Sequence, residues 1–337
     1  MKADRTGLDP TDAAELRRLL PGVTDADLPF HQQDRIKDHL MRETTRAERS
    51  AAAARPRPRR RLTLVLAAGV ATCAVVAAVA FTGQDSGGSP AVAKPEPAAV
   101  QLLDRVALAA QSSPLPTVRD GQFLYTRTKG FSTALSETTG GSMKPERTDE
   151  SAEHWVSVDG SSGTVTRSAK GTTTDPAPGG AKSTVNGPTY RFLESLPTDP
   201  DKLLAKIYED ARLNHGEGTD STTGPDQQAF VAIGDLLRTV EAPPGVSSAL
   251  YRAAARIPGV VYVPDATDAA GRAGVAVARV HDGERTEWIF DKTSFRLLGE
   301  RTVVLKKSAW GEAGTPVTSV AIVGRGITDK TGQQPKG

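Results

Sequence analysis

The apolar residues of this chain form one long uncharged run, followed by many short amphipathic segments. Residues 62–83 are 22 consecutive residues without a charged side chain, and most of them are Val, Ala or Leu. As a helix they would extend about 33 Å at 1.5 Å per residue, which matches the roughly 30 Å hydrocarbon core of a bilayer. The run therefore predicts a single transmembrane helix.

Charged residues beside this run predict its orientation. Five arginines precede it directly: Arg55, Arg57, Arg59, Arg60 and Arg61. The first charge after it is Asp85. Because positively charged flanks stay on the cytoplasmic side of a membrane, we expect residues 1–61 in the cytoplasm. The chain after about residue 84 would then be extracytoplasmic.

Three other interpretations of the run are open. A cleavable signal peptide could end at Ala78-Val79-Ala80 or Ala91-Val92-Ala93, but its apolar region would span only about 7–15 residues. A lipoprotein would use Cys73, which lies in the middle of the run. A buried core helix rarely lacks charge on every face. Length and late position favour an uncleaved anchor in the cell membrane.

Four later segments have the apolar periodicity of amphipathic helices. They span residues 98–110, 196–213, 228–244 and 246–256. In the second, Asp199 is expected as the N-cap and Pro200 as the first helical residue. The stripes of the last three helices are Leu203, Leu204, Ile207, Tyr208, Phe230, Ile233, Leu237, Val240, Leu250, Ala254 and Ile257. These stripes are more simply core faces than sites.

The remaining segments read as strands and turns. Before the helices, residues 121–130 predict a strand and residues 153–168 predict a hairpin around Asp159-Gly160. Residues 168–190 are so rich in Gly, Thr, Ser and Pro that a long flexible loop is expected. After the helices, strands are predicted at residues 260–263, 274–280, 284–290, 295–305 and 316–323.

The expected fold class is α+β, with an antiparallel sheet covered on one face by amphipathic helices. This domain would span residues 98–325, after a Gly/Ser/Pro linker at residues 84–97 and before a disordered tail at residues 326–337. Cys73 is the single cysteine. The domain therefore has no internal disulfide, and its core alone must stabilise it.

Charge makes direct binding of nucleic acid a poor expectation. The formal net charge is +2, and residues 1–61 carry 14 Lys and Arg against 10 Asp and Glu. The rest of the chain is nearly neutral, whereas a nucleic-acid interface needs a basic surface. Residues 1–61 predict two thin amphipathic helices, at about 11–20 and 30–50. They would either fold against a cytoplasmic protein or form a solvated tether near anionic membrane lipid.

Chemical motifs are mostly missing. We find no nucleophile elbow, zinc-protease helix, phosphate loop or dinucleotide fingerprint. His154, His215 and His281 are isolated in the sequence, so we expect no catalytic residue, metal or cofactor. Trp155 and Trp288 lie on separate predicted strands and could line a pocket for an apolar ligand. The simpler interpretation is that both are core aromatics.

The order of motifs resembles a large group of actinobacterial single-pass membrane proteins of uncharacterised function. The matching segments include LPTDPDKLLAKIYEDAR, AFVAIGDLLRTV, ALYRAAARIPGV, DATDAAGRAGVAVAR and WIFDKTSFRLLGERTVV. The resemblance implies a gene beside an extracytoplasmic-function sigma factor, and hence an anti-sigma-like role. Residues 1–61 hold no cysteine, so the zinc-binding His and Cys motif of many anti-sigma domains is missing. EHWVSVDG and WIFDKTSFRLLGER also resemble the hairpins of half-barrel lipoprotein carriers and sensor domains.

Two functional hypotheses follow. The first is a non-enzymatic regulator whose extracytoplasmic domain senses a ligand or envelope state, while residues 1–61 bind a cytoplasmic partner such as a sigma factor. The second is a membrane-anchored carrier or binding module for a lipid or another apolar ligand. A hydrolase is a third and weaker hypothesis, which would depend on the histidines.

Overall fold

The computed structural model describes residues 93–114, 117–138, 142–177, 183–215, 224–239 and 241–335. The predicted cytoplasmic residues 1–61 with their five arginines and the predicted span at 62–83 lie outside these ranges, as does most of the predicted linker. Within the described ranges, no helix combines the length and the apolar character that crossing a bilayer requires.

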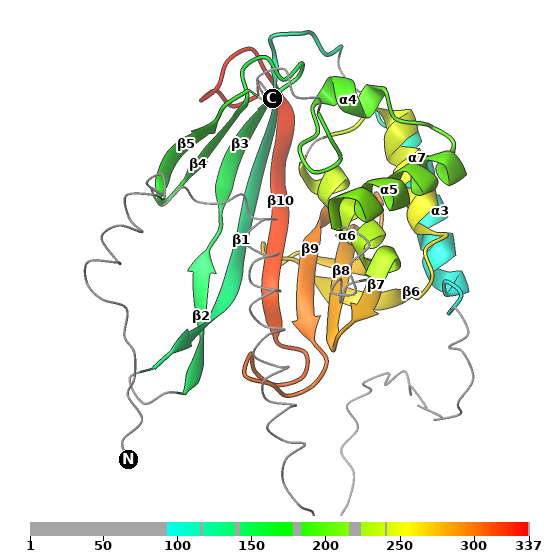
Figure 1. Cartoon of the computed structure of the whole chain (residues 1–337), viewed down its shortest axis with the longest axis vertical. Helices are drawn as coiled ribbons and strands as arrows, with labels where there is room; N and C mark the ends of the chain where they lie inside the picture. Colours follow the sequence, from blue (N-terminus) through cyan, green and yellow to red (C-terminus); the bar gives the residue numbers. More distant parts are fainter. Residues whose placement is uncertain are drawn as a thin grey trace, which may run out of the picture. The chain divides into compact units, whose positions relative to one another are not determined.

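The described residues contain one large antiparallel sheet with helices packed on it (Figure 1). Its strands are β1 (Phe123–Glu137), β2 (Met143–Asp149), β3 (Ala152–Ser157), β4 (Thr164–Ser168), β5 (Gly171–Asp175), β6 (Val260–Thr267), β7 (Ala273–His281), β8 (Glu284–Phe290), β9 (Leu297–Val304) and β10 (Pro316–Thr328). Their order is β5-β4-β3-β1-β10-β9-β8-β7-β6, and β2 pairs with β1. The sheet is open, and the predicted α+β class is confirmed.

Four of the described helices occur where apolar periodicity predicts them: α3 (Pro97–Gln111), α5 (Pro200–His215), α6 (Gly224–Thr239) and α7 (Pro244–Ala254). The short helix α4 (Tyr190–Glu194) was not predicted. At the start of α5, the Asp199 carboxylate accepts a hydrogen bond of 2.9 Å from the Lys202 amide, which confirms the predicted N-cap. Proline also begins α3 and α7, where a missing amide proton costs no helical hydrogen bond.

The helices cover one face of the sheet and form the main core with it (Figure 1). Leu203, Ile233 and Leu250 are fully buried in this cluster, as their periodicity predicts. Phe230 of α6 stacks on Trp288 of β8, with ring centroids 4.0 Å apart and planes 6° apart. The middle of α6 thus lies in tight contact with the sheet.

The sequence pattern does not predict the two polar strands β2 and β5. β2 and β5 have almost no buried side chain. Strands without an alternating apolar face give no periodic signal, although β-branched Thr is frequent in β5. The predicted flexible loop at 168–190 is therefore wrong where β5 lies within it, and α4 begins at its last residue. β1 also continues past the predicted end at residue 130, because it pairs with β2 as far as Glu137.

The C-terminal segment packs on the face of the sheet that lies opposite the helices. The disordered tail predicted at 326–337 does not describe residues 326–335, since β10 continues to Thr328. The Trp155 indole then donates a hydrogen bond of 2.7 Å to the Gln333 carbonyl. Trp155 forms a small aromatic cluster there with Phe123 and Tyr125.

The sheet curls at its β6–β7 end, because residues far apart in strand order are in contact there. Arg272, in the turn between β6 and β7, donates to the carbonyls of Leu298 in β9 and Ile322 in β10, at 2.9 and 2.8 Å. Arg301 of β9 reaches the Thr267 carbonyl of β6 at 3.2 Å. This curl brings Arg272 to the edge of a cavity between the helices and the sheet.

Candidate functional site

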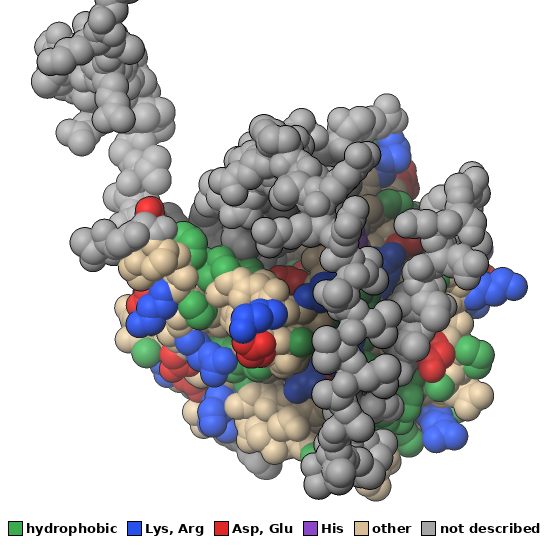
Figure 2. Space-filling view, turned by 90° about the horizontal axis from the view of Figure 1, so that it is seen from below, with side chains coloured by type: hydrophobic (Ala, Val, Ile, Leu, Met, Phe, Trp, Pro, Cys, Tyr) green, Lys and Arg blue, Asp and Glu red, His purple; other side chains and the backbone are tan. Residues whose placement is uncertain are grey.

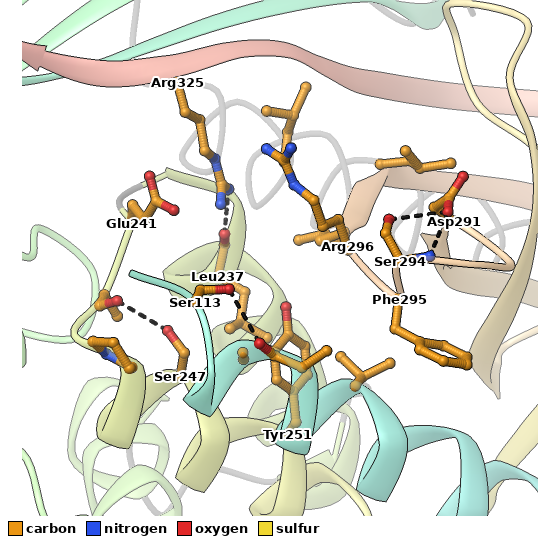
Figure 3. Close-up of a pocket in the computed structure, with 18 of the residues that line it drawn as sticks. Ser113, Leu237, Glu241, Ser247, Tyr251, Asp291, Ser294, Phe295, Arg296 and Arg325 are labelled. Carbon is orange, nitrogen blue, oxygen red and sulfur yellow. Dashed lines mark hydrogen bonds between the residues drawn. The ribbon is translucent and has the colours of Figure 1, made fainter. Parts of the chain in front are cut away.

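A cavity of about 470 Å³ lies between the helices and the sheet, at the C-terminal end of α6 (Figure 3). Helices α3, α6 and α7 form one wall, and the other comes from β9, β10 and the turn before β9. This volume falls within the roughly 300–1,000 Å³ of typical small-molecule sites. The polar groups of the wall are therefore considered one by one.

Arg325 enters the cavity from β10. Its Nη2 atom donates to the carbonyls of Leu237 and Arg238, at 2.5 and 3.1 Å, and so caps the last turn of α6. A cation is favourable at this end of a helix, where the dipole is negative. Its Nε atom is buried and makes no hydrogen bond within the described residues. Burial lowers the pKa of Arg325, and the nearby carboxylate of Glu241 acts in the opposite direction.

Arg296 enters the same space from the turn between β8 and β9 (Figure 3). Asp291 holds this turn, because its carboxylate accepts from the amides of Thr293 and Ser294 at 3.0 and 2.7 Å. These hydrogen bonds lower the pKa of Asp291. They also hold Phe295 in the left-handed region at φ +57°, which is unusual for a bulky residue. Arg296 follows directly and is exposed to the cavity.

The helix wall contributes a second set of polar groups. Tyr251 of α7 is only 6% exposed, yet its hydroxyl group points into the cavity and makes no hydrogen bond within the described residues (Figure 3). Burial raises its pKa, so the group stays protonated as a donor. Glu241 follows α6 and lines the same wall. In contrast, the Ser113 hydroxyl group donates to the Ala109 carbonyl of α3, and the Ser247 hydroxyl group donates to the Ala242 carbonyl just before α7.

Not every charge around the cavity is available to a ligand. The Arg272 guanidinium pairs with Asp268, at 2.6 Å, and with the two strand carbonyls described above. One oxygen of the Asp291 carboxylate accepts hydrogen bonds within its own turn, and the group keeps its charge. Arg296 and Arg325 therefore share the described wall with two carboxylates, those of Glu241 and Asp291.

The remaining wall is apolar. Val106, Ala109 and Ala110 of α3 line one side, and Leu237 and Leu297 line others. The small alanines leave room beneath α3, where larger side chains would fill the space. The cavity thus has an apolar side at α3 and a cationic end at β10.

The structure does not bring the two predicted ligand-lining residues together. Trp155 and Trp288 are 0% and 1% exposed and belong to separate clusters on opposite faces of the sheet. Neither lines the described cavity. Each side chain packs as a core aromatic, which was the simpler interpretation.

The histidines do not form a site either. His154 faces α6 from β3 and contacts the Thr166 hydroxyl group at 3.1 Å. Burial, with a smaller effect of Arg238, lowers its pKa to about 4. His281 ends β7, and the side chain of His215 is outside the described set. The described residues contain no group of His, Cys, Asp and Glu side chains that could hold a metal ion.

The surface gives no sign of a single-charge interface on the visible face. Figure 2 shows Lys and Arg side chains interspersed with Asp and Glu side chains over the described residues of that face. Mixed charge of this kind is typical of a solvated surface. The cavity therefore remains the strongest candidate site within the described part of the chain.

The chain matches no protein-family model, and no curated protein matches it significantly. The residues of the cavity therefore carry the functional argument. Sequence reasoning missed Arg325, Arg296, Glu241 and Tyr251 as site residues. One signal was present, because Arg325 interrupts the apolar segment VAIVGRGIT at a position that faces the helices.

Proposed function

We propose that the described domain is the ligand-binding sensor of a non-enzymatic regulator anchored in the membrane. A single observation carries this proposal: the Tyr251 hydroxyl group and the Arg296 guanidinium point into the cavity, and neither makes a hydrogen bond within the described residues (Figure 3). Ligand sites combine an apolar wall with a few polar groups that orient the bound molecule. A bound molecule that supplies acceptors would pair both groups.

The lining residues support binding rather than hydrolysis. No histidine is among the described residues of the wall, and Ser113 and Ser247 use their hydroxyl protons on backbone carbonyls. A nucleophilic serine requires a base within hydrogen-bonding distance. Among the described lining residues, the Ser294 hydroxyl group donates to the Asp291 carboxylate at 2.9 Å. The lowered pKa of Asp291 makes that carboxylate a weak base, so recognition is the better assignment.

The dimensions favour a small ligand over a membrane lipid. The cavity of about 470 Å³ lies in the lower half of the usual range for ligand sites. The apolar space that a lipid carrier would need between helices and sheet is occupied by core side chains such as Phe230 and Trp288. A sensor for a small molecule is therefore preferred to a lipid carrier.

Helix α3 provides a route for a signal. It begins at Pro97, the last residue of the predicted linker, and contributes Val106, Ala109 and Ala110 to the cavity wall. A ligand in the cavity would thus contact the helix nearest in sequence to the predicted transmembrane span. Through that span, residues 1–61 would respond by binding or releasing a cytoplasmic protein, for which a sigma factor is the proposed candidate.

The test blocks the cavity in the full-length chain. Ala109→Trp would fill it, whereas Ala205→Trp places the same side chain at an exposed position of α5 as a control. Both variants and the wild type, reconstituted in lipid nanodiscs, would be screened against small molecules by thermal shift. We expect at least one compound to stabilise the wild type and Ala205→Trp but not Ala109→Trp. The same stabilisation in all three would contradict the proposal.

The regulatory part has a separate test. Full-length protein would be used to capture transcription components in the presence and absence of a compound found in that screen. We expect the compound to change the amount of captured sigma factor by several-fold. An unchanged amount, or capture of no transcription component, would contradict the sigma-factor role and leave ligand binding intact.

A further inference from the structure

We infer that the cavity binds a monocarboxylate joined to a small apolar group. The inference rests on the proposed ligand-binding function and names the chemical class of the ligand. It follows from the geometry of one cationic end and one apolar side in the same space.

Charge favours a singly charged ligand over a doubly charged one. Arg296 and Arg325 face the cavity together with the carboxylates of Glu241 and Asp291. Arg325 is the more buried of the two arginines, and a buried cation is unfavourable unless it is paired. A phosphate monoester brings up to two negative charges close to two carboxylates, so a carboxylate is the better match.

Hydrogen bonding selects a planar acceptor group. Both described bonds of the Arg325 guanidinium come from Nη2, and Nε is buried, which leaves Nη1 for a ligand. The Arg296 guanidinium makes no hydrogen bond within the described residues and faces the same space. A guanidinium matches the two oxygens of a carboxylate in a fork geometry. The Tyr251 hydroxyl group adds a third donor from the helix wall (Figure 3). Carboxylate oxygens would thus satisfy the groups that the protein leaves unpaired.

Shape selects the rest of the molecule. The wall of α3 offers Val106, Ala109 and Ala110 to a ligand, and Leu297 faces the same space. A short alkyl or aryl group on this wall would exclude water from the ion pair, which strengthens it. A polar group at the same place would lose its hydration without gaining a partner. The ligand is therefore a carboxylate with an apolar body, not a hydroxylated acid or a sugar acid.

The experiment titrates the full-length chain in lipid nanodiscs with matched six-carbon probes, using isothermal calorimetry and empty nanodiscs as the blank. The probes are hexanoate, hexan-1-ol and hexyl phosphate. Hexanoate is expected to bind saturably, with an affinity at least tenfold above that of hexan-1-ol, which leaves the guanidinium unpaired. Hexyl phosphate should bind more weakly than hexanoate.

Variants locate the binding. Arg325→Gln should weaken hexanoate binding at least tenfold, and Tyr251→Phe several-fold. Tyr251→Phe loses only a hydroxyl group without a described partner, so it should fold even if Arg325→Gln does not. Arg105→Gln is the matched control, because Arg105 is an exposed residue of α3 outside the cavity wall. It should bind hexanoate as the wild type does.

Two results overturn the inference and are distinguishable from each other. Equal affinities for hexanoate and hexan-1-ol, both abolished by Ala109→Trp, would mean an apolar ligand without a carboxylate and would leave the proposed function intact. No binding of any probe, together with a compound screen that Ala109→Trp does not affect, would overturn the inference and the proposed function at once. Hexanoate affinity unchanged in both Arg325→Gln and Tyr251→Phe would place the carboxylate elsewhere and contradict the assigned groups.

Discussion

The middle and the C-terminal end of α6 meet the same sheet in opposite ways. In the middle, Phe230 stacks on Trp288 with centroids 4.0 Å apart. At the end, Leu237 borders the cavity and its carbonyl accepts from Arg325. One helix thus closes the core at one place and leaves a polar space about two turns later.

Particular residues cause this difference. Gly234 allows the middle of α6 to approach the sheet, since a Cβ atom there would lie 2.6 Å from Trp288 Nε1. Toward the other end, the pairing of β10 with β1 shifts between Arg127 and Thr128, opposite the β10 segment that leads to Arg325. At Gly234, the close contact with the sheet depends on the absence of a side chain. At the C-terminal end of α6, β10 carries Arg325 at a position where an apolar residue would extend the core. Four changes test this comparison, from the largest expected effect to the smallest.

Removing a side chain from the packed middle of α6 and the sheet beneath it should have the largest effect on the free energy of unfolding. Trp288→Ala removes a fully buried ring from the main core, and such truncations cost about 3–5 kcal/mol. The free energy of unfolding would be measured by denaturant titration of the full-length chain. Leu108→Ala is the control, because Leu108 is 58% exposed on α3, and it should change stability by less than about 0.5 kcal/mol. A loss below about 1 kcal/mol for Trp288→Ala would show that the middle of α6 is loosely packed.

The open end should be sensitive to acid through His154. Its pKa is lowered to about 4 in the folded chain by burial and Arg238, against about 6.5 in the unfolded chain. The unfolded state therefore binds the proton first as pH falls, and stability is lost between about pH 6.5 and pH 4. The loss from pH 7 to pH 5 should be about 2 kcal/mol. His154→Gln should remove this part of the pH dependence, and an identical pH profile of unfolding for both chains would refute the buried neutral histidine.

Adding one methyl group should test the close approach of α6. Gly234→Ala improves helix propensity but places Cβ against Trp288 and the Glu300 carboxylate, 2.9 Å away. Overpacking costs about 1–3 kcal/mol and propensity returns up to about 1 kcal/mol, so a net loss of about 1 kcal/mol is expected in thermal unfolding. Gly245→Ala in α7 is the comparison, because its nearest neighbour would be 3.4 Å away. It should be neutral, and equal losses at both positions would argue against a specific contact at Gly234.

Removing one charge at the open end should have the smallest effect on stability. Glu241→Gln changes a half-buried carboxylate without a described hydrogen bond, so unfolding should shift by less than about 0.5 kcal/mol. Hexanoate affinity should rise several-fold, because the bound carboxylate loses a like charge nearby. Calorimetry on the same nanodisc sample measures it. Weaker binding by the variant would mean that Glu241 takes part in recognition as an acceptor.

The sequence predicts the elements that have an apolar pattern and does not predict the polar ones. Periodic apolar stripes predicted α5, α6 and α7, and alternating runs with Asp-Gly turns predicted β3, β4 and the hairpins after β6. The polar strands β2 and β5 gave no such pattern. They form because β1 and β4 offer free edges for pairing, and pairing partners are not visible in local periodicity.

The cavity could not be predicted in the same way. Arg325 and Leu237 are 88 residues apart in sequence, and their contact depends on the end of α6, the strand register and the turn at Asp291 together. Local patterns describe which face of an element is apolar. They do not show where the apolar faces of a helix and a strand lie too far apart to pack against each other. Arg325, a lone arginine within an apolar strand, was the one local signal. Its contact with the end of α6 is visible only in the packed structure.

The most direct measurement follows methyl groups by NMR while hexanoate is added to the full-length chain in nanodiscs. Val106 and Leu297 line the cavity, whereas Val263 and Ile289 belong to a separate cluster on the other face of the sheet. Saturable shifts at the methyl groups of Val106 and Leu297, without shifts at the other two, are the predicted result. Unchanged spectra at saturating hexanoate, or shifts confined to Val263 and Ile289, would contradict a carboxylate site beneath the C-terminal end of α6.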